Sequence, residues 1–235
     1  MHVDADMKLL ARRAMSDPSG ALLVARVKRR HLTYLDGGAL LDLRDCVVSA
    51  ERRGQPGSII EAGCALGGSA IVLATSKAAA RPMHVFDAFG MIPPPSERDG
   101  LDVLERYEEI SSGSSSGIGD DTYYGYDPDL LATVKQNFLR FHIDLDKVHV
   151  DLVKGLFEDT ILPREPVAVA HVDGDWYDSV AVCLDRIWPV LVPGGVMIID
   201  DYDDWSGCRR AVDDFLISRS DVRVERHGRV HLVKV

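Results

Sequence analysis

Two short apolar runs in the second half of the chain are each followed at once by a cluster of aspartates. The runs cover residues 167–172 and 195–199, and they are nearly continuous and rich in β-branched residues. Such runs are typical of strands that are buried on both faces of a parallel sheet. Between them, apolar residues recur over 180–191 at the spacing of one helix face. The pattern predicts a β-α-β unit, in which both strands are parallel and end at the same edge of the sheet.

The aspartates at that edge form the first candidate site. Open α/β folds place their sites at the carboxyl ends of strands, and clustered carboxylates repel one another unless a proton or a cation intervenes. Hard oxygen donors suit Mg²⁺, Mn²⁺ or Ca²⁺. Acidic residues after strands also form turns and helix N-caps, so Asp178 or Ser179 can cap the following helix without any metal. Four carboxylates are candidates for the shared site: Asp173, Asp175, Asp200 and Asp201.

A strand, a glycine-rich loop and a helix earlier in the chain form a second candidate site. Residues 58–62 predict the strand, 63–69 the loop and 70–80 the helix. Glycines allow the loop backbone to approach a ligand, and the helix N-terminus offers unpaired N–H groups. The next strand, 84–86, ends in Asp87, which follows Gly63 by 24 positions, a distance at which an acidic residue commonly binds ribose hydroxyls. The dinucleotide glycine fingerprint is absent, so close packing at the glycines and a turn at Asp87 stay the alternative interpretation.

The flanking segments predict additions to this core. Residues 1–53 are expected to form a helical extension, broken at Asp17-Pro18 and again near Asp36. Residues 90–126 contain a proline run, a Ser/Gly run and a cluster of three tyrosines at 123–126. This composition fits a mobile lid whose tyrosines form an acceptor wall, or a flexible insert without a role.

The remaining elements complete an α/β order. A helix is expected from Pro128 with Asp127 as its N-cap, followed by a strand at 148–153. A further helix is expected at 208–218, and alternating strands at 222–225 and 230–235 predict an antiparallel hairpin.

Composition narrows the function classes. The 235 residues suit one domain with additions, with the main domain at 54–235. A formal net charge of −10 argues against nucleic acid as a partner. The sequence contains neither an apolar stretch of about 18 residues nor the order of a signal peptide, so we expect a cytoplasmic protein without a membrane partner. The cysteines are scattered and are expected to be free thiols: Cys46, Cys64, Cys183 and Cys208.

Taken together, three motifs resemble one known family. They are Glu-x-Gly-x-x-x-Gly-Gly at 61–68, Asp-Gly-Asp-Trp-Tyr-Asp-Ser at 173–179, and Asp-Asp-Tyr at 200–202. With the terminal hairpin, this order resembles class I S-adenosylmethionine-dependent methyltransferases, and more narrowly the macrocin O-methyltransferase (TylF-type) family, which methylates sugar hydroxyls of natural products. The resemblance implies a Rossmann-like α/β fold: a seven-stranded, mostly parallel sheet with a C-terminal antiparallel hairpin and helices on both faces.

The resemblance also implies residue roles. Asp175 matches the family's general base. The Mg²⁺ ligands, with Mn²⁺ or Ca²⁺ as alternatives, correspond to Asp173, Asp200 and Asp201. The positions that match the S-adenosylmethionine site are Glu61, Gly63, Gly67, Gly68, Ser69, Asp87, Ala88 and Asp173. The chain departs from the family at Ala65 and Leu66, where a tryptophan and a basic residue are usual, and at Asp203, where glycine is frequent.

The implied partner is a small-molecule acceptor, such as a glycosylated natural product, and the implied assembly is a homodimer built on the N-terminal helices. Two other functions fit the same residues. One is a catechol-type methyltransferase that acts on an aromatic diol, and the other is a scaffold that binds cofactor or metal without chemistry.

Overall fold

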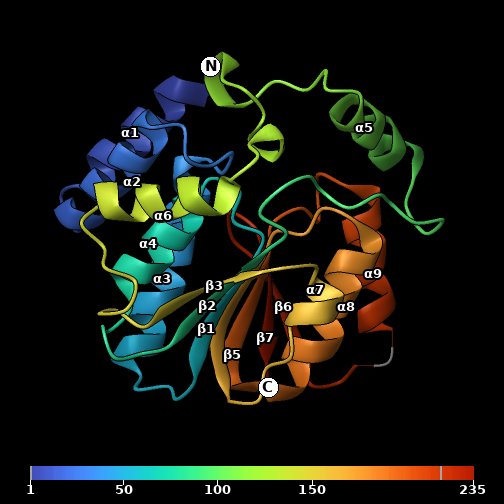
Figure 1. Cartoon of the computed structure of the whole chain (residues 1–235). Coiled ribbons are helices and arrows are strands. Elements are labelled where there is room, and N and C mark those ends of the chain that lie inside the picture. The colour runs from blue at the N-terminus through green and yellow to red at the C-terminus, as the bar shows by residue number, and fades with distance from the viewer. Residues whose placement is uncertain (1, 218) are drawn as a thin grey trace.

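A seven-stranded sheet runs through the centre of the protein, seen in a computed structural model that describes residues 2–217 and 219–235 (Figure 1). The strand order is β3-β2-β1-β4-β5-β7-β6. All pairings are parallel except β5–β7 and β7–β6. This confirms the predicted sheet with its antiparallel C-terminal hairpin. The strands are β1 Ser58–Ala62, β2 Met83–Asp87, β3 Val150–Lys154, β4 Val167–Val172, β5 Leu191–Ile199, β6 Val222–Arg226 and β7 Val230–Lys234.

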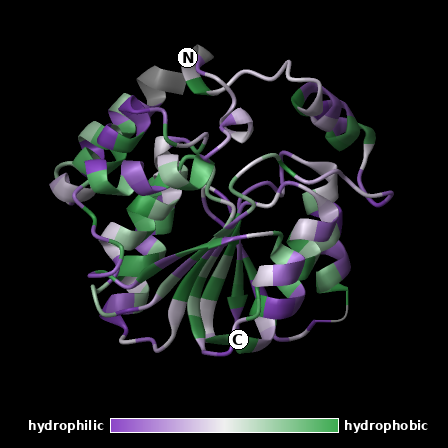
Figure 2. Cartoon of the chain, in the orientation of Figure 1, coloured by the Kyte–Doolittle hydropathy of each residue, from purple (hydrophilic) through white to green (hydrophobic). Residues whose placement is uncertain are grey.

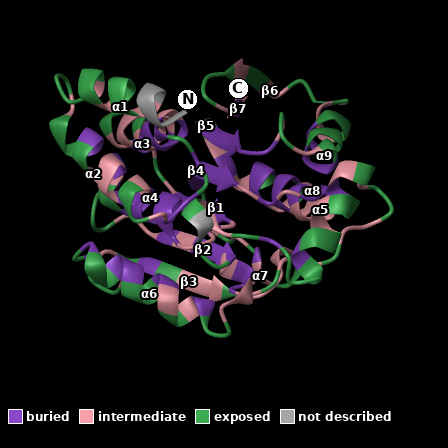
Figure 3. Cartoon of the chain, turned by 90° about the horizontal axis from the view of Figure 1, so that it is seen from above, coloured by how far each residue is buried: buried purple, intermediate pink, exposed green. Residues whose placement is uncertain are grey.

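Burial along the strands explains why their sequences look as they do. Every residue of β1 and β4 is buried, so both faces of these central strands are mainly apolar, and Ser58, Glu61 and His171 are the polar exceptions. The edge strand β6 is exposed along most of its length, and apolar and charged residues alternate along most of its sequence. The buried centre and the exposed rim are visible in Figure 3.

Helices cover both faces of the sheet (Figures 1 and 2). One apolar cluster joins the sheet to α2, α3, α4 and α6, and a second joins the other face to α7, α8 and α9. In Figure 2 the strands and the inward helix faces are hydrophobic, whereas hydrophilic residues lie on the outside. The helices are α1 His2–Arg13, α2 Pro18–Arg29, α3 Gly37–Arg52, α4 Gly68–Ser76, α5 Leu101–Ser111, α6 Leu130–Arg140, α7 Phe157–Thr160, α8 Tyr177–Ile187 and α9 Ser206–Leu216.

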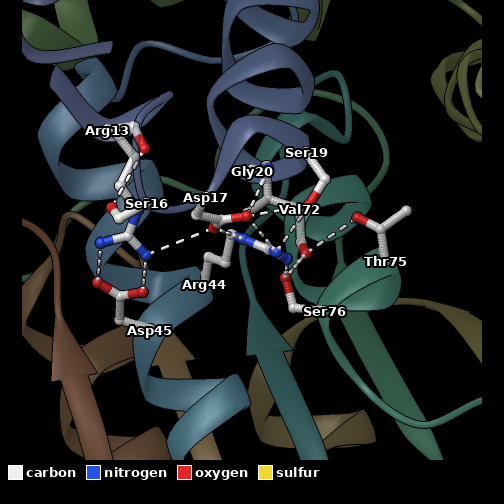
Figure 4. A network of polar contacts seen from close by, with 10 residues as sticks. All are labelled: Arg13, Ser16, Asp17, Ser19, Gly20, Arg44, Asp45, Val72, Thr75 and Ser76. Carbon is white, nitrogen blue, oxygen red and sulfur yellow. Dashed lines mark hydrogen bonds and ion pairs between the residues drawn. The ribbon is translucent and has the colours of Figure 1, made fainter. Parts of the chain in front are cut away.

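A polar network joins the N-terminal helices to the core (Figure 4). Asp17 caps α2 by accepting from Gly20 N, and Pro18 occupies the first turn. The same carboxylate accepts from Arg44 Nε at 2.7 Å, and Arg44 Nη1 reaches Ser76 Oγ on α4. The network therefore ties α2 and α3 to a helix that packs directly on the sheet.

The segment between β2 and α6 is folded and contains a helix that the sequence analysis missed. Within α5, Val103 and Ile110 are buried, and they lie seven residues apart on one helix face. Short 3₁₀ turns follow at Ile118–Asp120 and Tyr124–Tyr126. We call residues 88–127 the insert.

Several predicted boundaries were wrong for local reasons. Helix α6 begins at Leu130 and not at Pro128, because Asp129 rather than Asp127 caps it by accepting from Ala132 N. Neither Asp178 nor Ser179 caps α8, whose N-cap position is Trp176. Met1, the first residue of the predicted helical extension, and Ser218, the last residue of the helix predicted at 208–218, lie outside the described residues.

Candidate active site

A cavity of about 480 Å³ opens at the carboxyl ends of the parallel strands. The loops after β1, β2, β4 and β5 form its floor, and residues of the insert line its upper wall. Both predicted sites therefore open into one space. Of the predicted residues, Gly63, Ser69, Asp87, Ala88, Asp173, Asp175, Asp200 and Asp201 line it.

Three carboxylates lie close together in the cavity. One oxygen from each of Asp173, Asp175 and Asp201 lies within 4.8 Å of the other two. Burial and then the charges of neighbouring carboxylates raise the pKa of Asp173 and Asp201 well above its usual value, and they raise the pKa of Asp175 to about 6. A bound proton or cation would relieve the repulsion between these carboxylates.

The backbone at Asp175 is itself unusual. Its φ is +54°, in the left-handed region that few non-glycine residues adopt, and its N–H donates to Asp201 Oδ2 at 3.3 Å. Ala65 and Phe89 also have positive φ, in the loops after β1 and β2. Strained residues of this kind gather at functional sites, and here they occur in three loops at one edge of the sheet.

Asp200 has a different environment from the other three aspartates. Its Oδ1 accepts from Arg229 Nε at 2.7 Å and lies 3.7 Å from His171 Nε2. Although burial opposes the change, His171 and Arg229 lower the pKa of Asp200. Both basic side chains contact the same oxygen, Oδ1. Sequence reasoning missed Arg229, which the β6–β7 turn brings beside β5 from 29 positions away.

Backbone conformation and close contacts explain the glycines in the loop after β1. Gly63 has φ of +90°, and a Cβ there would lie 1.9 Å from Asp173 O. Gly67 has φ of +86° at the start of α4, and a Cβ on Gly68 would lie 2.6 Å from Leu32 O. Gly63 lines the cavity, whereas Gly67 and Gly68 do not; backbone conformation favours glycine at 67 and close packing favours it at 68.

Asp87 sits where the second strand ends. Its Oδ2 accepts from Cys64 N at 2.8 Å and its Oδ1 from Phe89 N at 2.6 Å. Burial raises the pKa of Asp87 in spite of these bonds. The carboxylate is thus fixed between two loops and still lines the cavity.

Glu61 and His171 form a buried pair behind the site. The Glu61 Oε1 to His171 Nδ1 distance is 3.3 Å, and both side chains are fully buried. Among the described residues, Glu61 Oε2 and His171 Nε2 are buried atoms without a hydrogen-bond partner. Burial works against the charged ring, but Asp200 and Glu61 raise the pKa of His171 to about 9. Glu61 does not line the cavity, so the structure places it as a support of the floor.

Aromatic side chains and one arginine form the upper wall. Tyr123 and Tyr124 stack with ring centroids 4.5 Å apart, and Tyr34 from the α2–α3 loop meets Tyr124 edge-on. Opposite them, Trp176 and Trp205 pack edge-on, 5.8 Å between centroids. Arg106 of α5 also lines the cavity. Of the three tyrosines in the lid interpretation, Tyr123 and Tyr124 line the cavity and Tyr126 does not.

All four cysteines are free thiols, as predicted, although Cys46 is only partly buried. No helix in the described part of the chain is long and apolar enough to cross a membrane.

Comparison with known proteins places this geometry among methyltransferases. A family model described as macrocin-O-methyltransferase (TylF) matches residues 32–224. The mycinamicin III 3''-O-methyltransferase of Micromonospora griseorubida is 34% identical over 80% of this chain and 73% of that protein. A tetracenomycin-C 4'-O-methyltransferase of Streptomyces olivaceus, whose substrate is named as an 8-demethyl-8-(2,3-dimethoxy-α-L-rhamnosyl) compound, is 33% identical over 90% of this chain and 73% of its own length.

Solved structures agree with the fold. The O-methyltransferase NovP has a TM-score of 0.67 at 24% identity, over 87% of this chain and 82% of that one. The calicheamicin methyltransferase CalS11 has a TM-score of 0.63 at 16% identity, over 98% of this chain and 91% of that one.

Proposed function

The chain belongs to the macrocin O-methyltransferase (TylF) family, and we propose that it transfers the methyl group of S-adenosylmethionine to one hydroxyl of a vicinal diol on the sugar of a natural product. It is an O-methyltransferase of the class I fold. The proposed acceptor follows its relatives, one of which is named for mycinamicin III and another for a rhamnosyl derivative of tetracenomycin C.

One observation carries the proposal. A single cavity holds both the loop that ends β1, with Asp87 beside it, and the carboxylates that end β4 and β5. Methyl transfer requires donor and acceptor to lie in line, so the two sites must share one space.

The residues at each half fit the group proposed for it. S-adenosylmethionine would be held by Gly63, Ser69, Asp87 and Ala88. Asp87 presents a carboxylate that hydrogen bonds hold in place, and Gly63 has no side chain to cover its backbone in the cavity. Asp173, Asp200 and Asp201 would hold a divalent cation, Mg²⁺ with Mn²⁺ or Ca²⁺ as alternatives. Their hard oxygen donors and the mutual repulsion within the cluster suit such an ion. When bound, the ion would lower the pKa of an acceptor hydroxyl, and the sulfonium would supply the methyl group.

The chain's own residues then perform the following roles. Asp175 accepts the proton of the acceptor hydroxyl at a carboxylate oxygen. Arg229 donates to Asp200 Oδ1 and His171 lies 3.7 Å from the same oxygen, so the two basic groups fix the position of this carboxylate. The Tyr123–Tyr124 pair and the Trp176–Trp205 pair exclude water from the reacting groups.

The first test is calorimetric titration of the protein with S-adenosylhomocysteine. We expect micromolar binding by the wild type and weaker binding by Asp87→Ala. Absence of binding by a folded wild-type protein would contradict the cofactor site.

The second test is methyl transfer to a panel that contains mycinamicin III, a methyl rhamnoside and catechol, with Mg²⁺ and then with EDTA. Transfer to the sugar hydroxyls that stops with EDTA and returns with Mg²⁺ supports the proposal. Transfer to catechol alone would support the catechol-type alternative, and cofactor binding without any transfer would support the scaffold. The homodimer and the cytoplasmic location stay predictions, which light scattering and cell fractionation check.

A further inference from the structure

Helices α8 and α9 begin without caps from their own flanking residues. Their N-cap positions are Trp176 and Trp205, and neither side chain makes a cap hydrogen bond. The first turn of a helix has N–H groups without intrahelical partners, and a carboxylate near it is also favoured by the helix dipole. These two helices follow the aspartate clusters directly, so their N-termini border the site.

The insert supplies the missing caps. Asp99 Oδ1 accepts from Tyr177 N at 2.8 Å, at the first residue of α8. Asp102 Oδ2 accepts from Ser206 N at 2.9 Å, at the first residue of α9, and Asp102 Oδ1 accepts from Ser206 Oγ. Although burial alone would raise the pKa of Asp102, the hydrogen bonds from Ser206 lower it. Two neighbouring helices are thus capped by one short segment from 78 and 104 positions away.

Two glycines leave room for this contact, one on each side of it. A Cβ on Gly207, in the first turn of α9, would lie 2.0 Å from Asp99 Oδ1. A Cβ on Gly100, between the two aspartates, would lie 2.3 Å from Ser206 Oγ. Neither glycine has a positive φ. Close approach of the two segments, and not backbone conformation, is therefore what requires glycine at both positions.

Further contacts attach the same part of the insert, residues 93–102, to α8, α9 and Trp176. Arg98 pairs with Asp178 and lies over the Tyr177 ring, 4.3 Å from its centroid. Arg210 Nη1 of α9 donates to Arg98 O at 3.1 Å. Upstream, Trp176 Nε1 donates to Pro93 O at 3.0 Å, and this indole is buried.

After residues 93–102, the insert contributes side chains to the upper wall of the cavity. Helix α5 begins one residue after Gly100, and its Arg106 lines the cavity together with Tyr123 and Tyr124. Tyr126 Oη donates to Ile110 O at 2.6 Å, which ties the end of α5 to the tyrosine segment. The attachment of α5 therefore contributes to the position of the insert's part of this wall.

We propose that Asp99 and Asp102 are positioning residues that clasp the insert to the N-termini of α8 and α9 and thereby hold the acceptor wall over the site. The inference rests on the proposed function for its effect on catalysis. The clasp itself is a property of the protein without ligands.

The test compares wild type with Asp99→Ala/Asp102→Ala, with Asp99→Asn, and with Glu97→Ala as the matched control. Glu97 is an exposed carboxylate two residues before Asp99. Trypsin cleavage after Arg98 and Arg106, and hydrogen exchange at the Tyr177 and Ser206 amides, report on the clasp in the absence of any acceptor. We expect both to be about tenfold faster or more in the double variant and unchanged in Glu97→Ala. Asp99→Asn should fall between wild type and the double variant, because its amide oxygen still accepts from Tyr177 N, whereas its amide nitrogen cannot accept from Ser96 N as Asp99 Oδ2 does.

The catalytic arm uses whichever member of the acceptor panel the wild type methylates. We expect the KM for that acceptor to rise about tenfold in the double variant, with kcat and the affinity for S-adenosylhomocysteine nearly unchanged. If the double variant does not fold, Ser206→Ala, which removes one bond to Asp102, gives the same comparison on a smaller scale.

Wild-type rates of cleavage and exchange in the variants would overturn the clasp. Faster cleavage with an unchanged acceptor KM would overturn the positioning role. If the wild type methylates nothing in the panel, the proposed function fails, and the ligand-free measurements still decide whether the clasp exists.

Discussion

At the scale of single residues, Asp175 differs from its neighbours in both backbone and role. It has a left-handed φ, it lies in the carboxylate cluster, and its pKa is raised to about 6. The proposed metal ligands need only negative charge and position, whereas a base must also exchange its proton during turnover.

Asp175→Asn should lower kcat by about 10²–10⁴-fold, because the amide cannot take the hydroxyl proton. The affinity for S-adenosylhomocysteine, measured by calorimetry, should stay near wild type. Asp185→Asn, an exposed change on α8, is the control. A wild-type turnover rate in Asp175→Asn would show that another group is the base.

Gly63→Ala should destabilise the protein by about 3 kcal/mol or more, because the new Cβ meets Asp173 O and the φ is unfavourable. Binding of S-adenosylhomocysteine should be lost with it. Gly54→Ala is the matched control: its φ is +61°, but no atom lies within 4 Å of the added Cβ, so we expect a cost of about 1 kcal/mol. Urea unfolding measures both, and equal costs would mean that the loop after β4 yields to the new atom.

The residue roles that sequence could not predict depend on contacts between distant segments. The four aspartates were predictable because each follows a buried parallel strand. That Arg229 neutralises Asp200 while Asp175 stays with Asp173 and Asp201 was not predictable, since the hairpin geometry decides it.

At the scale of elements, the junction of α2 and α3 depends on one carboxylate. Asp17 caps α2 and binds Arg44 of α3, and the hydrogen bond from Arg44 holds the pKa of Asp17 far below its usual value. A carboxylate whose folded pKa is lowered stabilises the fold at pH values above its unfolded pKa of about 3.9. That stability is lost as the pH falls below 4 toward the folded pKa.

Asp17→Ala should therefore cost about 2 kcal/mol at pH 7, since it removes a cap and leaves Arg44 without this partner. The difference from wild type should shrink as unfolding is repeated between pH 5 and pH 3. Asp129→Ala, which removes the cap of α6, should cost about 1 kcal/mol. A difference between Asp17→Ala and wild type that is constant with pH would contradict the assigned role of Arg44.

The elements were predictable where one pattern dominated. Buried parallel strands require apolar runs, so β4 and β5 could be predicted from the pattern, whereas the complete seven-stranded sheet was implied by the family resemblance. Helix α5 was missed because proline and serine runs surround it and only one face is buried. The cap of α6 was misplaced because Asp127 and Asp129 offer the same chemistry two residues apart, and tertiary packing decides between them.

At the scale of the whole molecule, the N-terminal helices belong to the core. Leu40, Leu43 and Val47 of α3 are fully buried, in the same apolar cluster as α4 and one face of the sheet. The predicted division at residue 54 therefore does not separate two independent cores.

A chain that begins at residue 54 should not fold, because the face covered by α3 would be exposed to water. A chain that begins at residue 17 keeps Asp17 and should fold, since α1 packs mainly on α2 and α3. Far-UV circular dichroism and soluble yield distinguish the two. A folded 54–235 product would mean that the N-terminal helices are an addition to the sheet rather than part of it.

The route of the insert through the fold has a consequence for how such enzymes diversify. The insert leaves the sheet after β2 and returns before α6, so no strand pairing depends on it. Its attachment to α8 and α9 uses Asp99 and Asp102, which precede position 103, and the backbone N–H groups of Tyr177 and Ser206. Residues 103–126 therefore form an exchangeable cassette between fixed anchors. Selection for a new acceptor can rewrite that cassette while the machinery of methyl transfer is inherited unchanged.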